Sequence, residues 1–254
     1  MTDMNNFVIE NGVLIKYEGD ETDVIIPAGI TRIGSCAFAD CDTVRSVIIP
    51  DEVTHINSLA FSECRSLQGI TILGAVKKIG KWAFKNCTSL KSVILPDGVE
   101  VISWNAFEGC TALKAIILPD SLNEIGAGTF DGCSALSIIN IPESVSEIGD
   151  GAFRGCVSLA DENSFVIIND RLCGYFGNAE SITVPNGIKR IDNGAFEERT
   201  ALVSVVIPDS VEEIGEDAFK NCSALKNVNI PYGVTYIDED AFTGCPFTPP
   251  AVSE

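Results

Sequence analysis

The stretch Leu90–Thr111 reads L-K-S-V-I-L-P-D-G-V-E-V-I-S-W-N-A-F-E-G-C-T, and this pattern returns along the 254-residue chain with a period of 23 residues. The phenylalanine of the pattern occurs at Phe38, Phe61, Phe84, Phe107, Phe130, Phe153, Phe196, Phe219 and Phe242. Every step is 23 residues except the step from Phe153 to Phe196, which is 43. A fixed period of this length indicates a solenoid, in which each repeat forms one turn of a coil.

Within one unit, the segment L-x-x-V-x-I has the alternation of a short β-strand. In Leu90–Leu95 it predicts that Val93 and Leu95 point inward and that Ile94 points outward. Proline then ends the strand, because it has no N–H to donate to a neighbouring strand. The segment V-x-x-I-G is expected to turn the chain, and A-F-x-x-C is expected to pack the opposite wall of the coil. Stacked units then bury the apolar faces that one unit alone leaves open.

The pattern resembles the leucine-rich-repeat superfamily, and within it the BspA-like, treponemal-type subclass with the form L-x-x-I-x-L-P-x-x-V-x-x-I-G-x-x-A-F-x-x-C. The resemblance covers residues 22–247. It implies a β-rich solenoid that winds as a right-handed superhelix, with a parallel sheet on one face and short turns on the other. It also implies a protein-interaction scaffold, and a role in adhesion at a bacterial cell surface.

Two segments outside the repeat predict β-hairpins. Residues 7–17 contain Asn11-Gly12 between apolar alternations, a strong signal for a two-residue turn, and the hairpin is expected to cap the first repeat. A similar segment at residues 165–175 explains the irregular step of 43 as one repeat plus an insertion of 20 residues. We therefore expect a single solenoid domain over residues 1–254. Its parts are a capping hairpin (1–21), six repeats (22–159), an inserted hairpin (160–180), and three repeats with a tail (181–254).

The charge balance excludes several classes of partner. The chain has 36 acidic and 17 basic residues and a net charge of −19, which argues against nucleic acid and against anionic membrane surfaces. No apolar run approaches the ~20 residues of a membrane-spanning helix, so no membrane insertion is expected. The termini carry no signal-peptide or lipidation pattern, which favours the cytoplasm by default, whereas the family resemblance implies the cell surface.

The presence of ten cysteines could indicate disulfides or a metal site, but eight of them occupy one position of the repeat. These eight are Cys41, Cys64, Cys87, Cys110, Cys133, Cys156, Cys222 and Cys245. No C-x-x-C motif is present, and stacked repeats point the Cβ atoms in parallel, which disfavours the torsion of a disulfide. We expect buried free thiols that act as small apolar fillers, as in a reducing compartment.

Catalysis and metal binding find little support. His55 is the only histidine and occupies a variable, surface-type position, so no Ser-His-Asp or Cys-His site is expected. We predict neither an enzyme nor a cofactor. Two acidic groups could in principle hold calcium, but they lack a loop of alternating carbonyl ligands, and a solvated face is favoured over a metal site. These groups are Glu212, Glu213, Glu216 and Asp217, and then Asp238, Glu239 and Asp240.

The outward residue at the centre of each strand is the leading candidate for a binding surface. This column comprises Ile25, Ile48, Thr71, Ile94, Ile117, Asn140, Thr183, Val206 and Asn229. Five of the nine are Ile or Val, which fits either the preference of β-branched residues for strands or a protein partner. The partner is unidentified, and a second copy of the chain is one candidate. The alternative function is carbohydrate binding by Trp82 and Trp104, which could instead pack against the wall of the coil.

Overall fold

The computed structural model describes residues 4–249, which form two compact units, 4–158 and 159–249. Each unit is a coil of short parallel strands. The only helical segments among the described residues are two single turns of 3-10 helix, η1 (Met4–Asn6) and η2 (Val157–Leu159). No helix in this part of the chain is long and apolar enough to cross a membrane. The β-rich solenoid that the repeat predicts is confirmed.

In the first unit, the L-x-x-V-x-I segments form a six-stranded parallel sheet in the order β13-β11-β9-β7-β5-β3. Each repeat supplies one strand, and the outer surface of this sheet is called the sheet face below. The strands are β3 (Asp23–Ile25), β5 (Ser46–Ile49), β7 (Gly69–Ile72), β9 (Ser92–Ile94), β11 (Ala115–Ile117) and β13 (Ile138–Ile139). Val93 is 1% exposed and Ile94 is 68% exposed, so the predicted inward and outward directions are correct.

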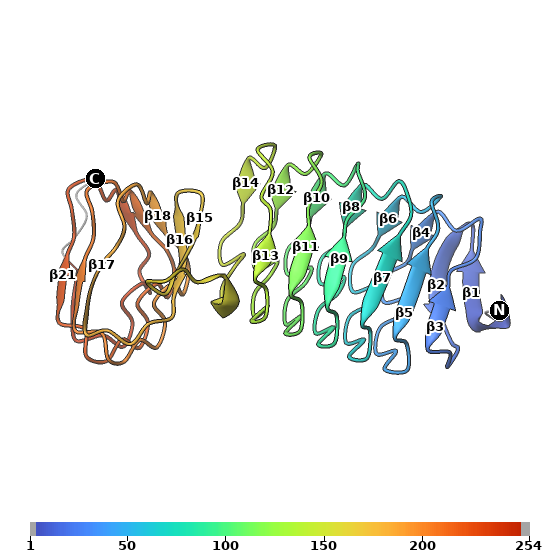
Figure 1. Ribbon diagram of the computed structural model, residues 1–254, viewed down its shortest axis with the longest axis horizontal. Helices are drawn as coiled ribbons and strands as arrows, with labels where there is room; N and C mark the ends of the chain where they lie inside the picture. Colours follow the sequence, from blue (N-terminus) through green and yellow to red (C-terminus); the bar gives the residue numbers. More distant parts are fainter. Residues whose placement is uncertain (1–3, 250–254) are drawn as a thin grey trace. The chain divides into compact units, whose positions relative to one another are not determined.

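The V-x-x-I segment does more than turn the chain, because two of its residues form a second parallel sheet. Its strands are β4 (Arg32–Ile33), β6 (His55–Ile56), β8 (Lys78–Ile79), β10 (Val101–Ile102), β12 (Glu124–Ile125) and β14 (Glu147–Ile148). The two rows of strands run side by side along the first unit (Figure 1). Turns that stack at the spacing of a sheet bring their backbone N–H and C=O groups into pairing distance, and buried groups of this kind require partners.

The N-terminal hairpin consists of β1 (Phe7–Glu10) and β2 (Val13–Tyr17), and β2 pairs in parallel with β4. Asn11 and Gly12 have φ angles of +50° and +75°, as the predicted two-residue turn requires. The hairpin therefore continues the second sheet and covers its first repeat strand, which confirms the predicted cap.

The second unit repeats this plan with fewer turns. Its five-stranded sheet contains β15 (Phe165–Ile168), β16 (Arg171–Tyr175), β18 (Arg190–Ile191), β20 (Glu213–Ile214) and β22 (Tyr236–Ile237). Its three-stranded sheet contains β17 (Ser181–Thr183), β19 (Ser204–Val206) and β21 (Asn227–Asn229). β15 and β16 form the predicted second hairpin, with Phe165 opposite Tyr175 as Phe7 is opposite Tyr17. That all repeats form one domain stays a prediction.

A stack of aromatic rings fills the centre of each unit. In the first unit it runs from Phe7 through Tyr17 and then Phe38 to Phe153, and successive ring centroids are 4.8–5.7 Å apart. In the second unit, Tyr175 continues in the same way into Phe196. The repeat phenylalanines are nearly inaccessible to solvent. Each hairpin therefore contributes a tyrosine at the position that phenylalanine holds in the repeats.

The glycines of V-x-x-I-G permit close stacking of neighbouring turns. A Cβ atom on Gly34 would lie 2.5 Å from the carbonyl oxygen of Leu14, and one on Gly126 would lie 2.6 Å from the backbone nitrogen of Trp104. Neither glycine has a positive φ. Glycine is favoured here because the backbones approach closely, and the need for a left-handed conformation does not explain it.

Candidate functional site

The sheet face of the first unit carries the exposed isoleucine column that the sequence predicts. Ile25 is 57% exposed, Ile94 68% and Ile117 49%, whereas Ile48 is half-buried. The Cα atoms of Ile94 and Ile117 are direct partners in the parallel pairing of β9 and β11. Their side chains are therefore neighbours on one surface, and they form an apolar stripe across adjacent turns.

Charged residues border this stripe on both sides. Basic side chains precede the strands, at Arg45, Lys91 and Lys114, and all three are exposed. Acidic side chains follow the strands, at Asp51, Asp97, Asp120 and Glu143, and these are also exposed. Strands that pair in parallel place equivalent residues on the same edge. The sheet face thus has a basic edge, an apolar centre and an acidic edge.

The stripe is interrupted at the third repeat, where Thr71 replaces isoleucine. A hollow of about 560 Å³ lies between β5 and β9 and is lined by Ile48, Thr71 and Ile94, with Gly69 beneath. The pairing of β7 with β9 is limited to Gly69 and Ser92. The inward side chains Ile70 and Ile72 are each 8% exposed at this point. The hollow therefore gives access to part of the apolar core and could accept an apolar side chain.

Asn140 and Asn229, both predicted as surface positions of the binding column, contact the backbone of the preceding repeat. The Asn140 side chain accepts from Leu118 N at 3.1 Å and donates to Leu118 O at 3.0 Å. Asn229 makes the same pair with Ile207, at 2.7 and 2.8 Å. Each asparagine lies in the last repeat of its unit. Its amide oxygen accepts from an N–H that in earlier repeats pairs with backbone, for example Leu95 N with Ile117 O.

The corresponding surface of the second unit is more polar. Its outward column consists of Thr183, Val206 and Asn229, of which Val206 is 51% exposed. Lys226 precedes β21, but Val203 occupies the equivalent place before β19. This surface therefore lacks both the isoleucines and the continuous basic edge of the first unit.

Trp82 and Trp104, the predicted alternative platform, are 36% and 51% exposed. They lie in adjacent repeats, where Trp82 N donates to Trp104 O at 3.1 Å. The ammonium group of Lys81 lies 3.9 Å from the centre of the Trp104 ring, a cation–π contact that covers one face of the indole. A bound sugar would compete with Lys81 for that face.

The acidic groups considered for calcium are engaged in ion pairs or dispersed. Glu212 pairs with Lys189 and Glu213 with Arg190, and the Asp217 carboxylate lies 2.9 Å from Lys220 Nζ. Among residues 4–249, no group of three or more His, Cys, Asp or Glu side chains is arranged to hold a metal ion. His55 is half-buried, and its Nδ1 lies 2.9 Å from the Thr54 hydroxyl.

In each unit, the repeat cysteines form a column of free thiols beside the aromatic stack of that unit. Each of seven thiols lies 2.9–3.2 Å from a phenylalanine carbonyl oxygen of the preceding repeat, as Cys110 does with Phe84. Burial raises the pKa of Cys222 to about 12, and burial also raises the pKa values of Cys64 and Cys110. Cys41, the first repeat cysteine of the first unit, and Cys245, the last of the second unit, are only half-buried.

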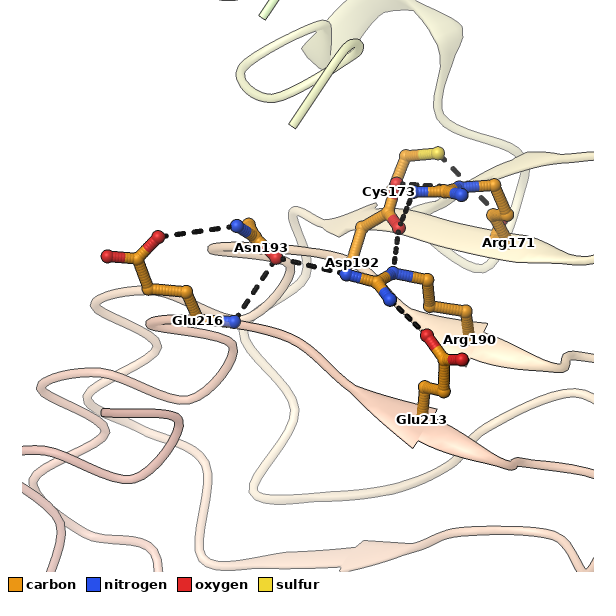
Figure 2. Close-up of polar contacts among 7 residues, drawn as sticks. All are labelled: Arg171, Cys173, Arg190, Asp192, Asn193, Glu213 and Glu216. Atoms are coloured by element: carbon orange, nitrogen blue, oxygen red, sulfur yellow. Dashed lines mark hydrogen bonds and ion pairs between the residues drawn. The ribbon is translucent and has the colours of Figure 1, made fainter. Parts of the chain in front are cut away.

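A charged cluster joins the second hairpin to the next repeat (Figure 2). Arg171 of β16 donates to both carboxylate oxygens of Asp192, at 2.6 and 3.2 Å, and Arg190 of β18 donates to one of them at 3.2 Å. Arg190 also pairs with Glu213 of β20. Asp192 is 1% exposed. Burial raises the pKa of its carboxyl, while Arg171 and then Arg190 act in the opposite direction.

Sequence reasoning missed this cluster and the two asparagine amide pairs. Asp192 could have been noticed in the sequence because it replaces the glycine found at the same position of other repeats, as Gly34, Gly126 and Gly149. The signal for the asparagines is that each belongs to the last repeat before an interruption. The thiol of Cys173 also lies beside Asp192, and burial together with that negative charge raises its pKa.

Comparisons with known proteins agree with this geometry. The BspA type leucine-rich repeat region, in six copies, matches residues 16–137, 60–169 and 166–248. A leucine-rich cell surface protein of Faecalibacterium prausnitzii is 30% identical over 96% of this chain and 84% of its own, with a TM-score of 0.63.

Two more distant solved structures share the fold. A leucine-rich repeat protein of Bacteroides ovatus is 23% identical, covers 92% of this chain and 80% of its own, and has a TM-score of 0.54. The pneumococcal vaccine antigen PcpA is 19% identical over 96% of this chain and 73% of its own, with a TM-score of 0.56. No match was found among curated proteins.

Proposed function

The chain belongs to the BspA-type leucine-rich-repeat family, and from that premise we propose that it is a non-enzymatic scaffold that binds a protein through the sheet face of the first unit. The observation that carries this proposal is the exposed stripe of Ile25, Ile94 and Ile117. Isoleucine side chains that stay in water forgo about 1.5–3 kcal/mol each of burial free energy. A partner that covers adjacent turns recovers that free energy.

The form of the surface favours a partner that covers several adjacent turns. The stripe crosses the strands and is bordered by opposite charges, so a polypeptide laid across the turns meets apolar groups at its centre and charges at both margins. The hollow between Ile48 and Ile94 offers one position for a larger apolar anchor. Anchors of this kind supply much of the affinity of protein interfaces.

The finer proposal is adhesion at the cell surface. The F. prausnitzii relative is described as a leucine-rich cell surface protein, and a rigid coil with an exposed apolar face suits contact with host or matrix protein. Beads coated with the protein should adhere to matrix or host cells. A variant altered on the sheet face should adhere less if that face makes the contact.

The sheet-face proposal is tested by the double variant Ile94→Glu with Ile117→Glu. Both side chains point outward, so the double variant is expected to fold and to lose binding to a partner captured from the source cell. Val206→Glu is the matched control, because Val206 is equally outward in the second unit. A double variant that folds and binds as the parent does would refute the proposal. A photo-crosslinking residue at position 94, with position 206 as its control, identifies the molecule bound.

Carbohydrate binding by Trp82 and Trp104 is the second candidate, favoured by the half-exposed indole of Trp104. Trp104→Ala should abolish binding on a glycan array if this platform is used. Lys81→Ala is the informative companion, because it uncovers the indole face that Lys81 now occupies and should strengthen sugar stacking.

A further inference from the structure

We propose that the protein partner of the sheet face is a second copy of this chain, bound face to face about a two-fold axis parallel to the direction of the repeats. This inference rests on the proposed function, since it takes the sheet face as the binding surface. It adds the identity of the occupant and the geometry of the contact.

The order of side chains along each strand carries the inference. In three repeats, a basic residue lies three positions before the outward isoleucine and an acidic residue lies three positions after it. These triplets are Arg45–Ile48–Asp51, Lys91–Ile94–Asp97 and Lys114–Ile117–Asp120. Their charged members are exposed; Lys91 donates to Gln68 at 3.5 Å, and Arg45 acts electrostatically on Asp23. In each triplet, two residues of opposite charge thus lie at equal distances along the chain from the central isoleucine.

Such a surface is complementary to itself in one orientation. A two-fold axis along the repeat direction keeps each repeat opposite its own copy and reverses the direction of the strands. Lys91 of one copy then faces Asp97 of the other, and Ile94 faces Ile94. A two-fold axis along the strands would instead set basic edge against basic edge. Like charges in contact disfavour that arrangement, so the charge order selects the first.

The fourth and fifth repeats form the centre of the contact. Ile94 and Ile117 are neighbours in register, and both are largely exposed. The third repeat has Gln68, Thr71 and Gly74 at the equivalent positions, so it contributes no basic residue, no apolar centre and no acidic residue. The isoleucines supply the apolar burial that holds the copies together. The charged edges align the two copies. Their attraction also opposes the repulsion expected between two chains that each carry a net charge of −19.

The second unit does not carry this pattern. Its equivalent triplets are Glu180–Thr183–Asn186, Val203–Val206–Asp209 and Lys226–Asn229–Tyr232, and none has a basic residue, an apolar centre and an acidic residue together. The self-complementary surface is therefore confined to the first unit. A charge of the second unit, such as Lys226, can therefore be reversed as a control for the change in net charge.

Sedimentation velocity of the full chain tests the proposal through two charge reversals. Lys91→Glu with Lys114→Glu makes both edges acidic, and Asp97→Lys with Asp120→Lys makes both edges basic. Each variant alone should dimerise roughly tenfold or more weakly than the parent, because like charges now face each other. An equimolar mixture should recover dimers, since every charged contact in the mixed pair is again between opposite signs. Thermal melts verify that both variants fold.

The control carries the same change of net charge elsewhere. Lys78→Glu with Lys226→Glu should leave dimerisation unchanged, because neither residue borders the sheet face of the first unit. A parent that stays monomeric at high concentration would overturn the proposal, and so would a mixture that stays monomeric. If the parent is monomeric and the double variant Ile94→Glu with Ile117→Glu still loses a captured partner, the proposed function stands and only the second copy is excluded.

Discussion

The second strand of each hairpin pairs in parallel with the V-x-x-I strand of the next repeat, but different side chains lie at the two junctions. In the first unit, Val13 of β2 lies beside Arg32 of β4, and Gly34 packs against the backbone of Leu14. In the second unit, the equivalent positions are Arg171, Arg190 and Asp192, which form a buried charged cluster.

This difference shows that the repeat specifies backbone pairing more strictly than side-chain chemistry. Gly34 N donates to Leu14 O at 2.8 Å, and Asp192 N donates to Leu172 O at 2.9 Å. Backbone hydrogen bonds hold both junctions; the first adds close packing at Gly34, and the second adds ion pairs. A buried carboxylate between two guanidinium groups is sensitive to the loss of any one member.

The largest expected effect comes from Asp192→Ala. It leaves Arg171 and Arg190 close together and largely buried without their shared carboxylate, so the second unit should lose about 3–5 kcal/mol of stability. Hydrogen exchange of the full chain, followed by mass spectrometry, should show faster exchange in β16 and β18. Exchange in β2 and β4 of the first unit should stay unchanged.

A matched variant separates charge from packing at the same junction. Arg171→Val with Asp192→Gly copies Val13 and Gly34 of the first unit and retains Arg190 as the equivalent of Arg32. Its stability should be within about 1 kcal/mol of the parent, because well-packed replacements for buried ion pairs are often neutral or stabilising. A loss as large as that of Asp192→Ala would show that the charges themselves hold the second hairpin.

A loss of stability is expected at alkaline pH, and it should occur in both units, because each unit contains buried thiols with raised pKa values. Unfolded thiols titrate near pH 8.5, whereas burial raises the pKa of Cys222 to about 12 and raises those of Cys64 and Cys110. The folded chain keeps protons that the unfolded chain releases, so stability is complete below about pH 8.5 and falls as pH rises toward 12. The slope is about 1.4 kcal/mol per pH unit for each such thiol.

Denaturant unfolding under reducing conditions at pH 8 and pH 10 measures this loss. Cys110→Ala should reduce the dependence of stability on pH, because it removes one thiol whose pKa burial raises. Rapid labelling of most thiols in the native protein at pH 8 would contradict the burial on which the expectation rests.

The smallest effect is expected from the two terminal amides. Asn140→Ala and Asn229→Ala each remove two hydrogen bonds to the preceding repeat and should cost about 1–2 kcal/mol. The two losses should be alike, since the geometry is alike in both units. Thermal unfolding measures both. Asn140→Asp keeps the acceptor for Leu118 N but loses the donor to Leu118 O, so it should recover only part of the loss.

The 23-residue period predicted the inward Val93 and the outward Ile94, and the turn motif Asn11-Gly12 with its analogue at residues 165–175 predicted the two hairpins. The sequence did not predict the second sheet, because strands of two residues have no periodicity of their own and exist only where turns stack. It also did not predict the Asp192 cluster, whose members come from different strands. Asn140 was assigned to the outward column by its position in the repeat, and it is exposed; its hydrogen bonds with Leu118 were not predicted, because Leu118 lies one repeat away in the chain. The role of the column in binding stays a prediction.

The continuous aromatic stack has a mechanical consequence. Each ring stacks on the ring before and the ring after it, and each turn packs mainly on its neighbours, so a pull on the ends of a unit would detach turns one at a time from the ends. One released turn of 23 residues reaches about 75–80 Å when extended. Under tension, such a chain would lengthen in equal steps, and each unfolding turn would dissipate part of the mechanical work.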